Sequence, residues 1–162
     1  MPVKPIPDDT SVVMPRLFCR DPLVELEFCE KTFGAEEQVR RSGPNGGISH
    51  ALITINGAMI MIESEWPNYA NRAPGMDGSS PVAIFVYVED VDQAMERAVA
   101  GGAKVLAPSA NQFWGDRSGW IMDPSGHVWT IATRIEETTE EQRQERLTKI
   151  LAPGSTTEVG VE

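Results

Sequence analysis

The feature that most constrains this chain is an internal repeat, in which matching residues recur at one fixed spacing. Asp21 and Asp90 each stand where a helix N-cap is expected. Gly57 and Gly126 each lie in a turn between two alternating apolar stretches, and the same length of sequence separates this pair as separates the two aspartates. Two successive segments with matching caps and hairpins indicate a duplicated unit, so the chain is expected to fold as two similar halves.

The first copy is predicted to be a βαβββ unit. Asp21 and Pro22 predict the start of a helix, and Gly34 predicts its end. The Asn56-Gly57 dipeptide is typical of a two-residue β-hairpin. Strands with alternating apolar residues are expected at 12–20, 36–41, 48–55 and 58–63.

The second copy repeats this order. A helix with apolar residues at helical spacing follows Asp90 and ends at Gly101-Gly102. Asp123-Pro124-Ser125-Gly126 predicts the turn of a hairpin within 112–134. Further strands are expected at 82–88 and 104–107. The fold class is therefore α+β, with two tandem βαβββ units.

The segments outside the repeat are polar. Thr138-x-x-Glu141 matches a helix capping box, and the helix after it is interpreted as solvated, with a partner-binding helix as the alternative. We expect an N-terminal arm at 1–11, one domain at 12–135 with units at 12–65 and 81–133 and a linker loop at 64–80, a charged helix at 136–151 and a flexible tail at 152–162.

Composition excludes several classes of function. Fourteen basic and twenty-four acidic residues give a net charge of −10, which argues against nucleic acid as a partner. The chain has no apolar run of the ~20 residues that a membrane span needs, and no apolar signal-peptide region. Cys19 and Cys29 form no CxxC pattern, so a cytoplasmic protein with reduced thiols is expected.

Five strings resemble the glyoxalase/bleomycin-resistance branch of the vicinal-oxygen-chelate superfamily, which also includes extradiol dioxygenases. The resemblance covers about residues 12–133. Within this branch, the chain is most similar to proteins encoded beside phosphonate-utilisation genes. The strings are FGAEE (33–37), SHALITING (49–57), VYVEDVD (86–92), QFWGDR (112–117) and DPSGHVW (123–129). The resemblance implies that each unit forms half of an incomplete β-barrel around a cavity for a small-molecule ligand. It also implies a homodimer, with the units paired within one chain or exchanged between two.

Metal-dependent members of this superfamily hold a divalent ion with His and Glu at four strand positions. The resemblance carries these positions onto Met14, Met61, Ala83 and Thr130. None of these side chains is a strong ligand for Zn²⁺, Ni²⁺, Fe²⁺ or Mn²⁺. No metal or other cofactor is therefore expected at the usual site, and the sequence also lacks a G-x-G-x-x-G or P-loop motif.

Two histidines and one carboxylate offer another chemistry. His50 faces Glu63 across the predicted hairpin, which suggests an acid–base pair or, together with His127, a non-standard metal site. The alternative for the His50–Glu63 pair is a structural hydrogen bond between strands. Tyr87 is a candidate proton donor, or else an interfacial side chain with its hydroxyl in water.

The candidate ligand-binding residues are apolar, aromatic or cationic. Methionines and aromatic rings suit a planar ligand, although the methionines would equally fill a core. Trp114 would stack on the ligand and Arg117 would clamp its anionic group; alternatively, Asp116–Arg117 anchors the loop. Trp66 would close the mouth as a lid or seal a dimer contact. The predicted ligand-binding residues are Met59, Met61, Phe85, Trp114, Arg117, Thr130 and Trp66.

The sequence thus predicts a metal-independent binder of a small planar or anionic molecule. The alternative is a metal-dependent lyase, isomerase or dioxygenase with a non-standard metal site around His50 and Glu63.

Overall fold

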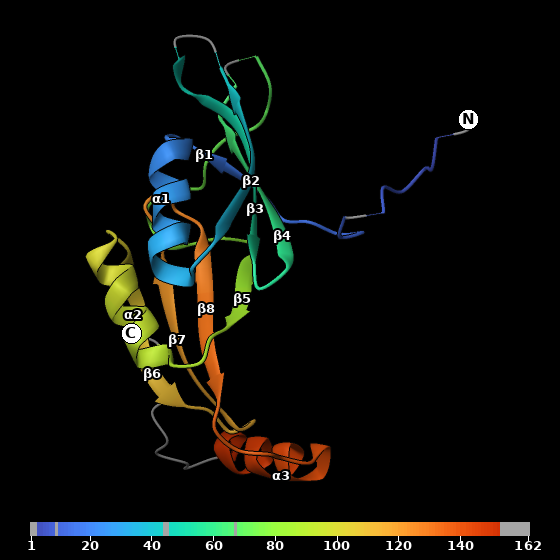
Figure 1. Ribbon diagram of the computed structural model, residues 1–162. Coiled ribbons are helices and arrows are strands. Elements are labelled where there is room, and N and C mark those ends of the chain that lie inside the picture. Colours follow the sequence, from blue (N-terminus) through green and yellow to red (C-terminus); the bar gives the residue numbers. More distant parts are fainter. Residues whose placement is uncertain (1–2, 9, 44–45, 67, 153–162) are drawn as a thin grey trace.

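The computed structural model describes residues 3–8, 10–43, 46–66 and 68–152, and it contains the two predicted βαβββ units (Figure 1). The first unit comprises β1 (Arg16–Cys19), α1 (Pro22–Phe33), β2 (Glu36–Ser42), β3 (Ile48–Ile55) and β4 (Ala58–Ser64). The second comprises β5 (Ala83–Tyr87), α2 (Val91–Ala100), β6 (Lys104–Asn111), β7 (Asp116–Met122) and β8 (Val128–Arg134). The chain continues into α3 (Glu140–Leu151).

Each unit forms its own four-stranded sheet. Sheet A has the order β1-β4-β3-β2, and sheet B has the equivalent order β5-β8-β7-β6. In both sheets the first and last strands of the unit pair in parallel and the other pairs are antiparallel. The α+β class and the duplication are therefore confirmed, and the two sheets remain open rather than closing into a barrel. Figure 1 shows α1 and α2 on the same side of the sheets, with α3 beyond one end of sheet B.

The predicted helix caps and turns explain why the units have these boundaries. Asp21 accepts hydrogen bonds from the first turn of α1, and Gly34 ends that helix with φ 66°. Asp90 caps α2 through the backbone N–H of Gln93. Asn56 and Gly57 adopt φ values of 48° and 83°, the left-handed pair that a tight hairpin requires.

A single hydrophobic core joins the two units on the helix side of the sheets. The rings of Phe33 in α1 and Trp129 in β8 lie 4.8 Å apart, and Trp129 is completely buried. Because side chains alternate along a strand, Ile60 and Ile62 of β4 enter this core, while Met61 lies on the opposite, outer face of sheet A. Side chains on the outer face of each sheet are therefore directed away from this core.

Two predicted boundaries were wrong. The first strand begins at Arg16 instead of Val12, since Pro15 has no N–H to donate, and Val12 is 80% exposed. The capping box of α3 uses Thr139 and Gln142. Thr138 is not the cap because its hydroxyl donates to the carbonyl of Trp114.

The segments outside the repeat carry little regular structure besides α3. The described part of the predicted arm, residues 3–8 and 10–11, contains no helix or strand. Residues 153–162 of the predicted tail lie outside the described residues. Among the helices of the described chain, none combines the length and apolarity needed to cross a membrane.

Candidate functional site

Three polar side chains from three strands meet on the outer face of sheet A. The register of the β3–β4 hairpin places His50 directly opposite Glu63, as predicted. The Nδ1 atom of His50 lies 3.2 Å from Glu63 Oε1, and Arg16 Nη2 of β1 donates to Glu63 Oε2 at 2.6 Å. The parallel pairing of β1 with β4 brings Arg16 to this position. We call these residues the Arg16–Glu63–His50 cluster.

The cluster holds Glu63 in its charged form although the residue is only 8% exposed. Burial by itself would raise the pKa of this carboxyl group. The hydrogen bonds from Arg16 and His50 outweigh that effect, and the net result is a lowered pKa. Glu63 is therefore a carboxylate at neutral pH, with each oxygen engaged by one neighbour.

Arg16 retains capacity to bind a ligand. Its side chain is 52% exposed, and its guanidinium lies 5.1 Å from the ring centroid of Phe18. Only Nη2 donates to Glu63, and within the described chain the other guanidinium N–H groups have no hydrogen-bond partner. A guanidinium fixed in this way presents donors in a planar fork, which suits a carboxylate or phosphate.

A pocket of about 510 Å³ opens beside Arg16. Its other lining residues, Trp66, Tyr69 and Asn71, all belong to the linker between the two units. The volume falls within the range of small-molecule sites in proteins. The linker thus places two aromatic side chains next to the exposed cation, and one of them is Trp66.

Hydrogen bonds tie together several described residues of the linker. Arg72 Nη1 donates to the carbonyls of Trp66 at 2.9 Å, Tyr69 at 2.7 Å and Asn71 at 2.8 Å. The Glu65 carboxylate accepts from the backbone N–H of Ala73 at 2.8 Å. These bonds hold the wall of the pocket in place before any ligand arrives, which lowers the entropy cost of binding.

The other predicted apolar residues divide between the two sheets. Met59 and Met61 lie half-buried on the outer face of sheet A, on the same strand as Glu63. Phe85 lies on the outer face of sheet B, where it pairs with Thr130 and is 49% exposed. Tyr87 lies on that face too, with its ring centroid 5.1 Å from that of Phe85.

Tyr87 and Trp114 share a buried acceptor. Asp116 is 2% exposed, and its Oδ2 accepts from the hydroxyl of Tyr87 at 2.9 Å and from Trp114 Nε1 at 2.8 Å. This hydrogen bond to Asp116 is the main reason that the pKa of Tyr87 is raised. The Tyr87 hydroxyl is thereby made a weaker proton donor, and the indole of Trp114 is fixed by its own loop.

Arg117 lies on the opposite face of sheet B, toward α2. Its Nε and Nη2 donate to Asp92 at 2.9 and 3.0 Å, and its Nη1 donates to Asn111 at 3.1 Å. The structure therefore does not bring Arg117 near the Arg16–Glu63–His50 cluster. The contacts of Arg117 and Asp116 correspond to the alternative interpretation, in which this pair anchors the loop.

The donor set does not fit a divalent metal ion. The described residues contain no group of three or more His, Cys, Asp or Glu side chains arranged to hold one. His50 and Glu63 lie together, but His127 Nε2 contacts the carbonyl of Phe18 at 3.1 Å and lies 3.9 Å from the buried Cys19 thiol. Burial lowers the pKa of His127. The three predicted donors are thus not brought together.

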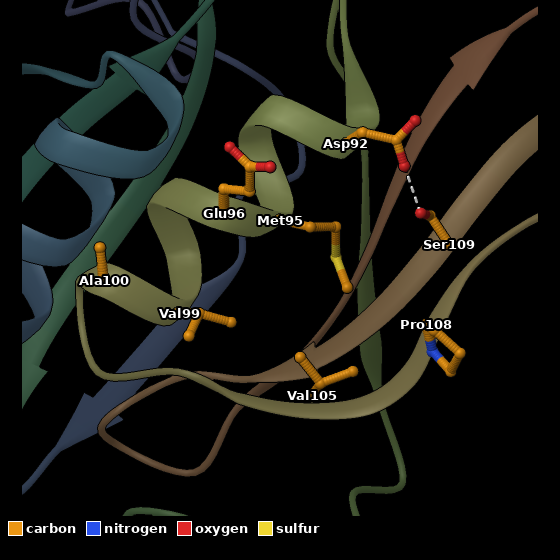
Figure 2. Close-up of a pocket in the computed structure, with 8 residues that line it drawn as sticks. All are labelled: Asp92, Met95, Glu96, Val99, Ala100, Val105, Pro108 and Ser109. Atoms are coloured by element: carbon orange, nitrogen blue, oxygen red, sulfur yellow. Dashed lines mark hydrogen bonds between the residues drawn. The ribbon is translucent and has the colours of Figure 1, made fainter.

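A second hollow of about 530 Å³ lies between α2 and β6. Figure 2 shows Met95 and Val99 of α2 opposite Val105 of β6, with Pro108 at one side. At the end of this groove Ser109 donates to Asp92, which also accepts from Arg117. Its polar groups at that end already bond to each other, so the groove offers mainly apolar contact. The pocket beside Arg16 is the better candidate site.

Sequence reasoning missed Arg16, Tyr69 and Asn71. One signal was available for Arg16, because it lies two residues after Met14 in the same alternation and therefore on the same strand face. Tyr69 and Asn71 carried no comparable signal, because their positions depend on how Arg72 folds the linker.

Comparison with known proteins shows which family the chain matches. Residues 11–131 match the family model described as Glyoxalase/Bleomycin resistance protein/Dioxygenase superfamily. An uncharacterized protein of Mycobacterium tuberculosis is 35% identical over 133 residues, which cover 80% of this chain and 78% of that protein.

Solved structures share the fold. TioX from Micromonospora sp. ML1 is 26% identical with a TM-score of 0.60, and the match covers 77% of this chain and 99% of TioX. The fosfomycin resistance protein FosX from Listeria monocytogenes, solved with Mn(II) and sulfate, is 22% identical with a TM-score of 0.59. That match covers 85% of this chain and 97% of FosX, and at this identity it shows the fold alone.

Proposed function

We propose, from the premise that this chain belongs to the glyoxalase/bleomycin resistance protein/dioxygenase superfamily, that it binds a small planar anion without a metal ion in the pocket beside Arg16. The observation that carries the proposal is the exposed guanidinium of Arg16, held by Glu63, at the edge of a preformed pocket lined by Trp66 and Tyr69. Within the superfamily, five strings together favour the branch associated with phosphonate-utilisation genes: FGAEE, SHALITING, VYVEDVD, QFWGDR and DPSGHVW.

The chemistry of the pocket supports a planar ligand with a negative group. The free N–H groups of Arg16 would form charge-assisted hydrogen bonds with a carboxylate, which are about twice as strong as neutral ones. The indole of Trp66 and the ring of Tyr69 supply aromatic surface for a flat ligand. A carboxylate on an aromatic ring combines both properties.

We also propose that two copies of the chain associate. The outer face of sheet B exposes Phe85, Tyr87 and Trp120, each about half accessible to solvent. Aromatic side chains gathered on one open sheet are typical of a surface that is covered in the functional protein. A second copy would cover this face with the outer face of its own sheet A and would enclose the ligand. Sedimentation at micromolar concentration should show a dimer, and Phe85→Asp should shift it to monomer; a wild-type monomer would contradict this proposal.

The binding test compares two probes that differ only in charge. 2-Naphthoate should quench the intrinsic tryptophan fluorescence on titration, and 2-naphthamide, which is equally flat but neutral, should bind at least about tenfold more weakly, because one hydrogen bond to a charged group contributes about 1.5–3 kcal/mol. Arg16→Gln should remove this preference for the anion.

Arg40→Gln is the matched control. Arg40 also pairs with a glutamate, Glu37 at 2.5 Å, but it lies on the exposed strand β2 away from the pocket. Equal affinity of the two probes for the wild-type protein, or equal loss in both arginine variants, would contradict the proposal.

A further inference from the structure

We propose that Asn71 determines which planar anion the pocket beside Arg16 prefers. In this proposal the ligand carries a carboxylate, which binds Arg16, and an amide, primary or cyclic, which pairs with the side chain of Asn71. The inference rests on the proposed function, because the anion must bind in that pocket. It deepens that function by naming the second polar group of the ligand and the residue that recognises it.

The residues that line the pocket differ in the hydrogen bonds that their side chains can form. The guanidinium of Arg16 and the indole N–H of Trp66 only donate, so both suit the negative group of the ligand. Asn71 carries an NH₂ donor and a carbonyl acceptor side by side in one plane. A ligand group with an adjacent acceptor and donor can pair with both, and an amide is the simplest group of this kind.

The side-chain amide of Asn71 is available to a ligand. Within the described chain, the one hydrogen bond of this residue is that of its backbone carbonyl, which accepts from Arg72 Nη1 at 2.8 Å. Asn71 is half-buried, so an apolar group placed against its amide would displace water without replacing the hydrogen bonds of that water. A ligand whose amide pairs with Asn71 should therefore bind more tightly than one that is apolar at this end.

The backbone on both sides of Asn71 is anchored. Arg72 Nη1 also donates to the carbonyls of the other two linker residues at the pocket, at 2.9 and 2.7 Å. The backbone N–H of Ala73 donates to the Glu65 carboxylate at 2.8 Å. These bonds restrict the position of Asn71 before a ligand binds, which reduces the entropy cost of pairing. Tyr69, in contrast, is 65% exposed, so its hydroxyl stays hydrated without a ligand.

The test compares two ligands of the same shape. 6-Carbamoyl-2-naphthoate and 6-acetyl-2-naphthoate both carry a carboxylate, and both present a carbonyl group at the opposite end of the ring system. They differ only in that the NH₂ of the first is a CH₃ in the second. Calorimetric titration measures the Kd of each. Wild-type protein should bind the carbamoyl compound about fivefold more tightly, because its N–H adds one hydrogen bond to the Asn71 oxygen.

Asn71→Leu should abolish this preference. Leucine is similar in size to asparagine but forms no side-chain hydrogen bond, so the two compounds should bind with equal affinity. The acetyl compound should bind this variant at least as tightly as it binds wild type, because no polar group is left unpaired against its methyl. A disrupted pocket would instead weaken both compounds.

Asn68→Leu is the matched control. Asn68 belongs to the same linker, but it is exposed and is not among the residues that line the pocket. This variant should keep the wild-type preference for the carbamoyl compound. Tyr69→Phe tests the other lining residue that can accept a hydrogen bond, and it should also keep the preference.

The outcomes separate the inference from the proposed function. Equal affinity of wild type for the two compounds, with binding that Arg16→Gln removes, overturns the role of Asn71 and leaves the proposed function standing. Equal weakening of both compounds in Asn71→Leu, or loss of the preference in Tyr69→Phe alone, also overturns that role. Binding of neither compound, or binding that Arg16→Gln leaves unchanged, overturns the proposed function and the inference together.

Discussion

The two units share one topology but present opposite chemistry on their outer faces. In the first unit the face carries a cation, a carboxylate and an imidazole, and in the second unit the register-equivalent positions are aromatic or small. The pairs of equivalent positions are Arg16 and Phe85, Glu63 and Ala132, and His50 and Ser118. The duplicated backbone therefore does not dictate the site. One copy carries charged groups on its outer face, and the other carries exposed aromatic side chains there.

The helices α1 and α2 also differ on the side that faces the core, where α1 carries ionisable side chains and α2 carries alanines. Glu25 and Cys29 of α1 correspond to Ala94 and Ala98 of α2, and all four are fully buried. Glu25 Oε1 accepts from the Cys29 thiol at 3.6 Å, while Oε2 has no hydrogen-bond partner in the described chain. Burial, followed by the negative charge of Asp123, raises the pKa of Glu25 well above its ordinary value.

The β7–β8 turn explains why the first unit tolerates this carboxyl group. Asp123 of that turn accepts from Trp129 Nε1 at 2.7 Å and from the backbone N–H groups of Ser125 and His127, at 2.9 and 2.8 Å. These donors satisfy the side-chain oxygens of Asp123. The raised pKa of Glu25 favours its neutral form, which costs less than a charged carboxyl group in a buried site.

The largest effect on stability should come from placing a glutamate in α2 at Ala94, the position that corresponds to Glu25 of α1. In Ala94→Glu a carboxyl group enters a fully buried position of α2 that lacks the turn facing Glu25. We expect the free energy of unfolding to fall by about 3–5 kcal/mol, as for other uncompensated buried charges. Urea denaturation measures this, with the exposed Ala100→Glu on the same helix as control, expected to change by under about 1 kcal/mol. Similar losses in both variants would show that the two helices do not differ in this way.

A smaller effect should appear in the pH dependence of stability. The folded-state pKa of Glu25 is raised, so its contribution is fully present below the unfolded value of about 4.3 and is lost as pH rises through the folded value. Glu25→Gln keeps a neutral group that can donate to Asp123. We expect this variant to exceed wild type by about 1–3 kcal/mol at pH 8, with a smaller difference at pH 5.

Glu27→Gln is the control for that experiment, because Glu27 lies on the same helix but is exposed and paired with Lys31. Thermal unfolding at pH 5, 6.5 and 8 would follow the three proteins. A constant difference between Glu25→Gln and wild type at all three values would argue against a raised pKa.

The smallest effect on stability is expected for a substitution in sheet B. Trp114→Phe removes one donor from buried Asp116 and leaves the other, the Tyr87 hydroxyl. The expected loss is about 1 kcal/mol in the free energy of unfolding. Affinity for 2-naphthoate should stay within about twofold of wild type. A clear loss of naphthoate affinity in Trp114→Phe would restore Trp114 to the ligand site.

Trp120→Phe is the control for that variant, because Trp120 lies at a half-exposed position of the same sheet. Both variants are measured in the Phe85→Asp background, so that the proposed dimer contact does not contribute. A surface site of this kind should change the free energy of unfolding by less than about 0.5 kcal/mol.

Local patterns in the sequence were sufficient for the repeat, the caps of α1 and α2, both hairpin turns and the pairing of His50 with Glu63. Each of these depends on residues close together in the chain, where alternation and turn chemistry determine the geometry. The site itself could be predicted only in part. Arg16 reaches Glu63 through parallel pairing of strands that are far apart in the sequence, and local periodicity does not report such a contact.

The burial of Glu25 likewise could not be predicted from local sequence patterns. A glutamate in the first turn of a helix is ordinary on sequence grounds, since it complements the helix dipole. Its burial depends on the packing of α1 near Asp123, which lies much later in the chain, in the other unit. The difference between the two helices therefore depends on how the two units pack together.

In the proposed function, Arg16 of the first unit holds the anion, and no metal ion does. Calorimetric titration of the protein with 2-naphthoate, once with EDTA and once with added Mn²⁺, tests this most directly. We expect the same affinity in both titrations and loss of binding in Arg16→Gln. Binding that appears only with the metal, or that persists undiminished in Arg16→Gln, would contradict it.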